Sequence, residues 1–425
     1  MSLAPPINAQ RLWSRVEALA GFTDAGTPWT RRAFTPLHLR SREWLRDQFA
    51  AAGMHVSLDA GGNLVGRIEG TGPTAAPPLV TGSHCDTVPS GGRFDGIIGV
   101  LAGIEVAHAL RESGAALSRP LEVIDFLSEE PSEYGISCVG SRAIAGQLSP
   151  AMLEARSPDG ETLAQGLRRI GGDPDALHRP LRDAGSVAAF VELHIEQGPV
   201  LESRNLPIGV VTNIVGIRRY VIVVEGRPDH AGTTPMHLRS DALAGAARII
   251  SAAQEQALRL DGQPHYVVAT VGRLSLTPNA SNAVPGRVEM VLEVRSDSTG
   301  VLAQFADALM SSVGADLARL RVKADVQQVS ESKPTDCSPL VMDAIDAAAA
   351  ALRYPTMRLP SGAGHDAVYM AAAAPMGMIF IPCKGGRSHC PEEWIEPQQL
   401  LDGTRMLAQA LVELDRQLSL SPSGR

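Results

Sequence analysis

Cysteine is scarce in this 425-residue chain, and long runs of apolar or of basic residues are absent. The five cysteines are an odd number, lie far apart and form no Cys-x-x-Cys pair, which argues against a disulfide framework and a zinc ribbon and fits a reducing cytoplasm. The longest uncharged apolar stretch, residues 371–381, is shorter than the roughly 20 residues that cross a bilayer. Residues 1–10 lack the basic and apolar regions of a signal peptide. We therefore expect a soluble, cytoplasmic protein with no membrane partner.

The charge of the chain is modest and negative. The formal net charge is -8 and the pI is near 5.8, and no cluster of lysine and arginine is dense enough to bind a phosphate backbone. We expect no nucleic-acid partner and a small molecule as the substrate. The length predicts two domains with a large core.

Strands and helices alternate at both ends of the sequence, which predicts a sheet with helices on both faces. The expected strands are at residues 79–83, 121–126, 188–193 and 377–381, and the expected helices are at 98–111, 139–147, 340–352 and 399–417.

Between these ends the pattern changes to a βαββαβ order, which is typical of a ferredoxin-like unit. The expected elements are a strand at 220–225, a helix at 241–258, strands at 266–276 and 287–294, a helix at 301–317 and a strand at 320–329. Candidate site residues lie on both sides of this unit in the sequence. We therefore predict an α/β fold in which residues 216–331 are a domain inserted into a catalytic domain of residues 1–215 and 332–425, with the active site at the junction.

Imidazoles and carboxylates follow the expected strands, at the positions where α/β enzymes carry their chemistry. They are His84 and Asp86, Glu129 and Glu130, His194, and His389, and Asp95 lies just before the helix at 98–111. A site for two divalent metal ions needs neutral imidazoles, carboxylates, and one carboxylate that bridges the ions. We predict that Asp95 is the bridge. His84 and His194 would complete one metal site, and Glu130 and His389 the other.

Two further carboxylates lie beside these predicted ligands. Glu129 is offset by one residue from Glu130, so it can act as a general base on the metal-bound water. Alternatively, Glu129 is the ligand and Glu130 is a solvated acid at a helix start. Asp86 can accept the second ring N–H of His84 and fix its tautomer, or it caps a turn before Thr87.

Three polar residues of the inserted domain are candidate substrate contacts. His230, on the loop at 229–236, can donate to a carbonyl or an oxyanion, although a histidine on a loop is often only a surface residue. Asn282 and Arg295 flank the strand at 287–294 and suit a substrate carboxylate. Taken alone, Arg295 is more typical of a surface ion-pair partner.

The small-residue loop at 361–367 can bring backbone N–H groups to a ligand. It contains Ser361, His365 and Asp366, but residues this close in sequence rarely achieve the geometry of a catalytic triad. The sequence also has no Gly-x-Ser-x-Gly elbow. We reject a serine hydrolase.

Together these segments resemble the hydantoinase/carbamoylase branch of the aminoacylase and carboxypeptidase metallopeptidase superfamily. The segments that carry the resemblance are residues 82–88, 91–96, 129–130, 192–199, 230–236, 361–367 and 388–389. The resemblance implies a zinc-peptidase-like catalytic domain with an inserted lid and dimerisation domain. It implies two divalent metal ions per subunit, zinc or manganese first, with cobalt or nickel also compatible with the donors. It also implies a homodimer in which His230 reaches the active site of the neighbouring subunit.

The resemblance also assigns a role to each site residue. The implied metal ligands are His84, Asp95, Glu130, His194 and His389, and Glu129 is the implied base. The implied substrate contacts are Gln197, His230, Asn282, Arg295 and Gly364, with Arg295 and Asn282 on the substrate carboxylate.

The relatives that this resemblance implies remove a ureido group, as ammonia and carbon dioxide, from a small acid. Pro131 follows the paired glutamates where many carbamoylases carry glycine, a feature similar to plant ureidoglycolate amidohydrolases, whereas residues 230–236 keep the carbamoylase form. We predict a metal-dependent amidohydrolase that cleaves the C–N bond of a ureido (N-carbamoyl) group, on an N-carbamoyl amino acid, allantoate or ureidoglycolate. The alternatives are a dipeptidase or N-acyl amino-acid deacylase with the same metal pair, and a non-catalytic binding protein. The presence of every predicted ligand and of the base argues against the last.

Overall fold

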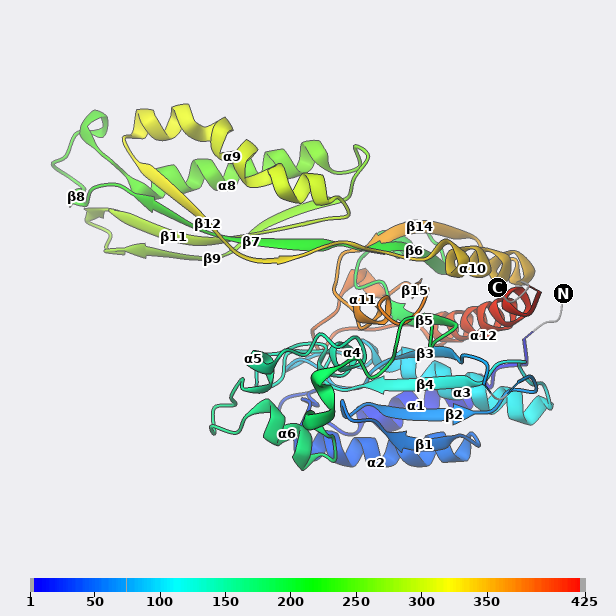
Figure 1. The fold of residues 1–425 in the computed structure, drawn as a ribbon. Coiled ribbons are helices and arrows are strands. Elements are labelled where there is room, and N and C mark those ends of the chain that lie inside the picture. Colours follow the sequence, from blue (N-terminus) through cyan, green and yellow to red (C-terminus); the bar gives the residue numbers. More distant parts are fainter. Residues whose placement is uncertain (1–3, 74, 421–425) are drawn as a thin grey trace. The chain divides into compact units, whose positions relative to one another are not determined.

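The computed structural model describes residues 4–73 and 75–420. These residues form two compact units, one from the residues up to Thr212 and from Cys337 onwards, the other from Asn213–Asp336. Figure 1 shows the course of the chain through both. The borders lie within a few residues of the expected domain limits. No helix in the described part of the chain is both long and apolar enough to span a membrane.

A nine-stranded sheet, in the order β1-β2-β4-β3-β5-β15-β6-β13 with β14 beside β6, is the centre of the first unit. Its strands are β1 (His55–Leu58), β2 (Leu64–Ile68), β3 (Leu79–His84), β4 (Leu121–Phe126), β5 (Ala189–Ile195), β6 (Ile208–Ile214), β13 (Thr335–Asp336), β14 (Thr356–Ser361) and β15 (Met376–Ile381). The central strands β4, β3, β5 and β15 run parallel. The mixed α/β architecture with a large sheet is the one that the sequence predicted.

The helices of this unit differ in how deeply they are buried. They are α1 (Ala9–Ala20), α2 (Pro36–Ala51), α3 (Ile97–Ser113), α4 (Val139–Ile144), α5 (Pro150–Leu153), α6 (Leu163–Arg169), α7 (Val200–Ser203), α10 (Pro339–Leu352), α11 (Ala367–Met370) and α12 (Pro397–Leu420), with 3-10 turns at Pro174–His178 and Lys384–Gly386. Nearly every residue of α3 is buried, which makes it the central helix of the core with α1, α10 and α12. This burial fits its largely apolar sequence, and its one fully buried acid, Glu105, pairs with Arg11 and Arg15 of α1.

Strand β5 shows why the two faces of the sheet differ. Its side chains alternate between the faces. Leu193 and Ile195 lie in the core beneath α3 and α12. Glu192 and His194 point to the other face, where the backbone N–H of Ala367 at the start of α11 donates to Glu192. A one-residue shift of this strand would move the histidine into the apolar core.

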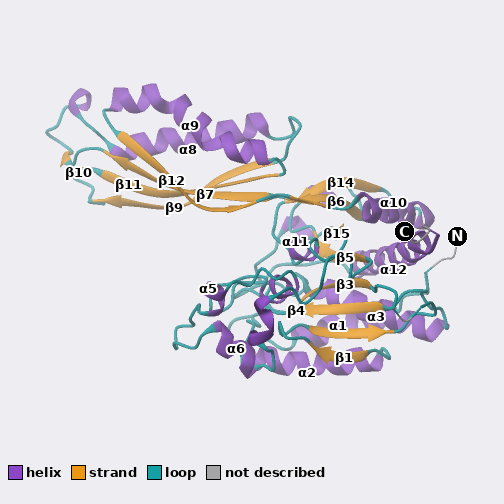
Figure 2. Cartoon of the chain, viewed as in Figure 1, coloured by secondary structure: helices purple, strands orange, loops and turns teal. Residues whose placement is uncertain are grey.

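The second unit has the βαββαβ order that the sequence predicted, with a short ladder added. Its elements are β7 (Gly216–Glu225), β8 (Asp229–His230), a 3-10 turn (Met236–Leu238), α8 (Ala242–Leu260), β9 (Val267–Thr277), β10 (Ala283–Val284), β11 (Arg287–Ser296), α9 (Thr299–Leu320) and β12 (Lys323–Ser332). The antiparallel sheet has the order β12-β7-β11-β9. Figure 2 shows α8 and α9 together on one face of this sheet, over an apolar core of alternate strand residues.

Candidate metal centre

The predicted ligands emerge from the carboxyl ends of the parallel strands. His84 is the last residue of β3, Glu129 follows β4 by three residues, and His194 lies near the end of β5. The ladder pairs His84 with Phe126 and Phe380 with His194. These ends therefore meet at one edge of the sheet, as they do in α/β enzymes. The histidines belong to the strands themselves rather than to the loops that follow, which differs from the expected boundaries by one or two residues.

The first group of possible metal donors comprises His84, Asp95 and His194. One ligand atom from each lies within 4.8 Å of the others, and all three residues are buried. The Nδ1 atom of His84 lies 3.0 Å from the backbone oxygen of Asp86, and that of His194 lies 2.9 Å from the oxygen of Ile195. Because a carbonyl only accepts a hydrogen bond, each Nδ1 carries a proton, and Nε2 is the ring nitrogen left for a metal ion to bind.

The second group comprises Asp95, Glu130 and His389. His389 Nε2 lies 2.9 Å from Asp95 Oδ2 and 2.9 Å from Glu130 Oε1, whereas the other oxygen of Asp95, Oδ1, lies 3.0 Å from His194 Nε2. Asp95 thus turns one carboxylate oxygen toward each group. This is the arrangement that a bridging ligand requires, and the mixture of imidazole nitrogen and carboxylate oxygen suits divalent transition metals.

The charges around this centre also favour cations. Asp86, Asp95 and Glu130 are nearly inaccessible to solvent, and buried carboxylates are costly unless opposite charges compensate them. Hydrogen bonds from His194 and His389 outweigh burial and hold the pKa of Asp95 well below its usual range. Asp95 and Glu130 in turn raise the pKa of His389 to about 11. Burial lowers the pKa of His194, but Asp95 and Glu192 outweigh this effect and raise it to about 9. A metal ion would compete with protons for these nitrogens.

Glu129 lies beside both groups and belongs to neither. Its Oε2 is 3.7 Å from His84 Nε2, and the thiol of Cys138 is placed to donate to its Oε1 at 3.5 Å. Burial and the neighbouring carboxylates, Glu130 first, raise the pKa of Glu129 well above its usual value. Glu130, by contrast, is buried against His389. The geometry therefore does not match the alternative in which Glu130 is a solvated acid.

Asp86 differs from its predicted contact. Its carboxylate accepts hydrogen bonds from the backbone N–H groups of Glu129 and Glu130, both at 3.2 Å, and its Oδ1 is 3.6 Å from His84 Nδ1. The backbone carbonyl of Asp86 is closer to that ring nitrogen and fixes the tautomer. The reason is that the chain turns after β3, which brings the carbonyl onto the ring and frees the side chain for the β4 loop.

Two of the predicted substrate contacts lie close to the metal centre. Gln197 has a left-handed backbone (φ 56), and its Nε2 donates to Asp95 Oδ2 at 2.9 Å. Gly364 is exposed with open space around it, and the adjacent His365 ring packs against His194 with a centroid separation of 4.6 Å. The left-handed backbone of Gln197 is rare for a residue other than glycine, so the structure around the site must hold it in place.

The other three predicted contacts, His230, Asn282 and Arg295, belong to the second unit. The first two lie together, and Arg295 lies apart from them. Ala283 pairs with His230, and Asn282 accepts a hydrogen bond from Ala231, so His230 and Asn282 are neighbours near the Arg287 end of β11. Arg295 is eight residues further along that strand, roughly 26 Å away at 3.3 Å per residue. The prediction that Asn282 and Arg295 together hold one carboxylate is therefore wrong within a single chain. Both flank the same strand in sequence, but an extended strand separates its two ends.

Several residues of the candidate site had no predicted role. Glu393 binds the loop that carries Asp95, Ser388 contacts Asp95 directly, and Glu192 and His365 lie next to His194. Ser361 Oγ and His365 Nε2 are 2.8 Å apart, but Asp366 pairs with Ser141 instead, in keeping with the rejection of a triad. The sequence offers one signal that could have found Glu393: it is the second of two adjacent acids and lies four residues after His389.

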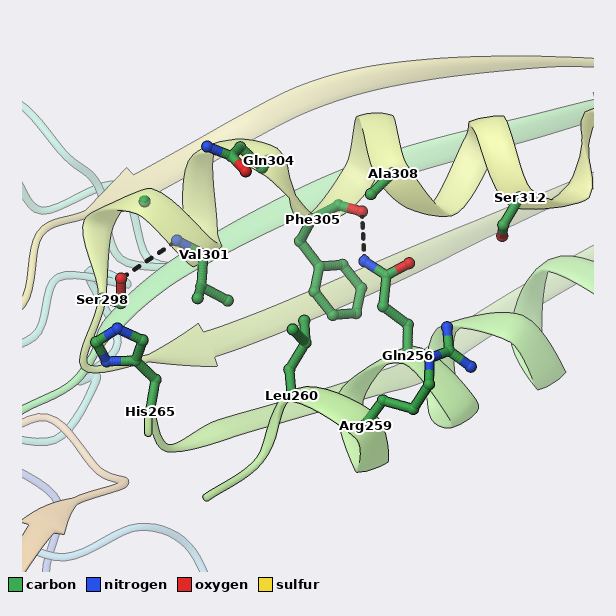
Figure 3. A pocket seen from close by; sticks show the side chains of 11 residues that line it. Gln256, Arg259, Leu260, His265, Ser298, Val301, Gln304, Phe305, Ala308 and Ser312 are labelled. Atoms are coloured by element: carbon green, nitrogen blue, oxygen red, sulfur yellow. Dashed lines mark hydrogen bonds between the residues drawn. The ribbon is translucent and has the colours of Figure 1, made fainter. Parts of the chain in front are cut away.

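A separate cavity of about 500 Å³ lies between α8 and α9 of the second unit (Figure 3). Its lining includes His265, Phe305 and Gln256, whose Nε2 donates to the backbone oxygen of Phe305. No predicted site residue lines it.

Paired imidazole and carboxylate groups at the carboxyl ends of parallel central strands are features of the metal-dependent α/β hydrolases. Residues 80–413 match the peptidase family M20/M25/M40, and the chain belongs to this family. It is 39% identical over 410 residues to the N-carbamoyl-L-amino-acid amidohydrolase of Paenarthrobacter aurescens, covering 96% of this chain and 98% of the relative. It is 35% identical to the ureidoglycolate hydrolase of Arabidopsis thaliana, covering 96% of this chain and 87% of the relative.

A solved structure gives the same result. The hydantoinase/carbamoylase family amidase of Burkholderia multivorans superposes with a TM-score of 0.89 at 36% identity, covering 96% of this chain and 98% of the amidase. The predicted family membership is confirmed, and so is the prediction of an enzyme that hydrolyses carbon–nitrogen bonds other than peptide bonds.

Proposed function

We propose that this protein is a metal-dependent amidohydrolase that cleaves the C–N bond of a ureido group on a small acid. The observation that carries the proposal is Asp95, whose two oxygens face two separate donor groups. The similarity to amidohydrolases of N-carbamoyl amino acids and to ureidoglycolate hydrolases supports the substrate class.

We infer that His84, Asp95 and His194 hold one divalent cation and that Asp95, Glu130 and His389 hold another. When bound, such cations polarise a carbonyl and acidify water. The residues of the chain then move the protons. Glu129 accepts the proton of the attacking water and returns it to the departing nitrogen. In the chain without bound ions, burial and the neighbouring carboxylates raise the pKa of Glu129.

The carboxylate of the substrate is assigned to Arg295. A guanidinium binds a carboxylate through two parallel hydrogen bonds, and Arg295 already lies 2.7 Å from the carboxylate of Glu293. If Asn282 and His230 also contact the same substrate, they must come from a second copy of the chain, because one chain holds them roughly 26 Å from Arg295 along β11. This separation supports the homodimer.

We propose that two copies pair through β9 and α8. β9 is an edge strand of its sheet, and its exposed Val268 and Leu274 accompany exposed Leu243 and Leu258 of α8. An exposed apolar edge strand is normally covered, and a two-fold axis would place both copies equivalently. Leu274→Arg should convert the dimer to a monomer in sedimentation experiments. A wild-type chain that is fully active as a monomer would contradict this proposal.

A mixing experiment tests whether His230 acts in the neighbouring subunit. His230→Ala and Glu129→Gln proteins, each inactive alone, are mixed under conditions where subunits exchange. One site of each mixed dimer then carries both defects and the other is intact, so this species should show about half the activity of the wild type. A mixture that stays inactive despite demonstrated exchange would refute action in trans.

The substrate class is tested with a panel assayed on metal-depleted and metal-reconstituted protein. N-carbamoyl amino acids, allantoate and ureidoglycolate represent the proposal. N-acetyl amino acids and dipeptides represent the second candidate function, a deacylase or dipeptidase, which the match to a peptidase family supports. Metal-dependent release of ammonia from a ureido acid would support the proposal, whereas turnover of peptides or acyl amino acids alone would replace it.

A further inference from the structure

Glu393 is a buried carboxylate that binds two loops from opposite ends of the sequence. Its Oε1 accepts hydrogen bonds from the backbone N–H groups of Phe94 at 2.8 Å and Asp95 at 3.1 Å. Its Oε2 accepts from Ser388 Oγ at 2.8 Å, and only 1% of the residue is exposed. One side chain thus holds the loop of Asp95 and the loop of His389 together.

The loop of Asp95 closes tightly around this carboxylate. A Cβ atom added at Gly92 would lie 1.9 Å from Cδ of Glu393, so only glycine leaves room for it. Ser388 Oγ also lies 2.9 Å from Asp95 Oδ2, so the single proton of this hydroxyl lies between Glu393 and the shared carboxylate. His389, next to Ser388, has a left-handed backbone (φ 55), a conformation that surrounding contacts must maintain.

We propose that Glu393 is a positioning residue that selectively maintains the metal site formed by Asp95, Glu130 and His389. This inference rests on the proposed metal centre and adds a residue that contacts no ion itself. Groups that orient metal ligands through hydrogen bonds typically change metal affinity by about 10-fold to 100-fold when they are removed.

The expected selectivity follows from how the two groups are held. His84 and His194 belong to strands β3 and β5, and their ring nitrogens bind backbone carbonyls of their own segments rather than Glu393. The first group therefore depends on Glu393 only through Asp95, which the two groups share. The second group depends on it for two of its three members, because Asp95 and His389 both lie on the loops it joins. His389 is also the most exposed of the donors, with 48% of its side chain accessible, so little else fixes it.

The test measures metal binding rather than turnover. Full-length protein is depleted of metal and titrated with zinc against a chromophoric competing chelator, and cobalt is added in a parallel titration to record its visible absorption. Wild-type protein should bind two ions per chain. Glu393→Ala should weaken the lower-affinity site at least tenfold, change the other less than threefold, and alter the cobalt spectrum of the second ion.

Two variants make the result specific. Glu393→Gln should restore binding to within about threefold, because its amide oxygen can still accept from Phe94 and Asp95 while its amide nitrogen donates to Ser388. Glu392→Ala is the matched control, since this adjacent acid is exposed and pairs with Arg387, and it should leave both constants unchanged. If Glu393→Ala fails to fold, Ser388→Ala, which removes only the hydroxyl link, should still weaken the second site selectively.

Two results would overturn the inference: unchanged constants in Glu393→Ala, or equal weakening of both sites in a protein whose circular dichroism is native. A wild-type chain that binds fewer than two ions would instead overturn the proposed metal centre, and this inference with it.

Discussion

Replacement of Glu129 by glutamine tests whether this residue is the general base or a metal ligand. The amide has the shape of the carboxylate and can still accept the Cys138 thiol that lies 3.5 Å from Oε1, but it cannot take a proton from water. Since Glu129 belongs to neither donor group, metal content should remain at two ions per chain. A positioned acid/base group is worth about 10²–10⁴ in rate, which corresponds to about 2.7–5.5 kcal/mol of barrier. We expect kcat to fall by this factor with KM little changed.

The same substitution should stabilise the metal-depleted protein. Burial and neighbouring carboxylates raise the folded-state pKa of Glu129 above its unfolded value, so the folded state holds this proton more tightly. The wild type therefore loses stability as the pH rises from the unfolded pKa, near 4.3, through the raised folded pKa, whereas glutamine does not titrate. A tenfold difference in proton affinity between the folded and unfolded states corresponds to about 1.4 kcal/mol of stability. The melting temperature of the variant should match that of the wild type near pH 4 and exceed it at pH 7.

Three measurements check this prediction: steady-state kinetics on a ureido acid, metal analysis, and melting temperature against pH without metal. Glu133→Gln is a matched control, because Glu133 follows in the same loop and forms a more exposed ion pair with Arg32. The reasoning fails if the Glu129 variant loses an ion along with its activity, because Glu129 would then be a ligand. It also fails if the variant is less stable than the wild type at pH 7.

Three further predictions concern the other charged and glycine positions. Arg295→Ala should lower kcat/KM for substrates with a free carboxylate, by a factor that corresponds to about 2–5 kcal/mol, the cost of removing one partner of a desolvated charge pair. The matching amide substrates should lose much less. Equal losses for acids and amides would show that Arg295 is structural. Metal binding near pH 7 should release about two protons, because His194 and His389, with pKa values of about 9 and 11, are protonated until a cation displaces them. Zinc affinity should therefore rise with pH, steeply up to about pH 9 and less steeply from there to about pH 11. Calorimetry in buffers of different ionisation enthalpy measures the proton release, and a constant affinity would contradict the assignment. Gly96→Ala should abolish binding at the first site, because the added Cβ would lie 2.3 Å from His84 Nε2. Gly135→Ala is the control, since Gly135 has nearly the same φ (+69 against +70) but open space around it. It should cost only the backbone strain of about 1–2 kcal/mol and keep both ions.

The sequence was informative wherever a residue's role follows from its own strand. His84 and His194 each end an apolar run, and parallel strands bring such ends to one edge, so their proximity could be predicted without knowing any side-chain contact. The βαββαβ order of the second unit was readable for the same reason, because its signal is the local alternation of apolar residues. Strand ends were less certain by one or two residues, since hydrogen bonding rather than hydropathy sets them.

Contacts between remote loops could not be predicted in this way. The loops at residues 91–95 and 388–393 are almost 300 residues apart and are brought together by the fold, so nothing in the spacing shows that Glu393 accepts a hydrogen bond from Asp95 N–H. Asp86 failed for a related reason: its backbone carbonyl, which every residue possesses, performs the task that its carboxylate was expected to perform. Because the carbonyl performs this task, the Asp86 carboxylate is free to accept hydrogen bonds from the backbone N–H groups of Glu129 and Glu130. A single side chain therefore orients the proposed base and one proposed ligand. Asp86 and Glu393 thus each accept hydrogen bonds from backbone N–H groups of candidate site residues that are remote from them in the sequence.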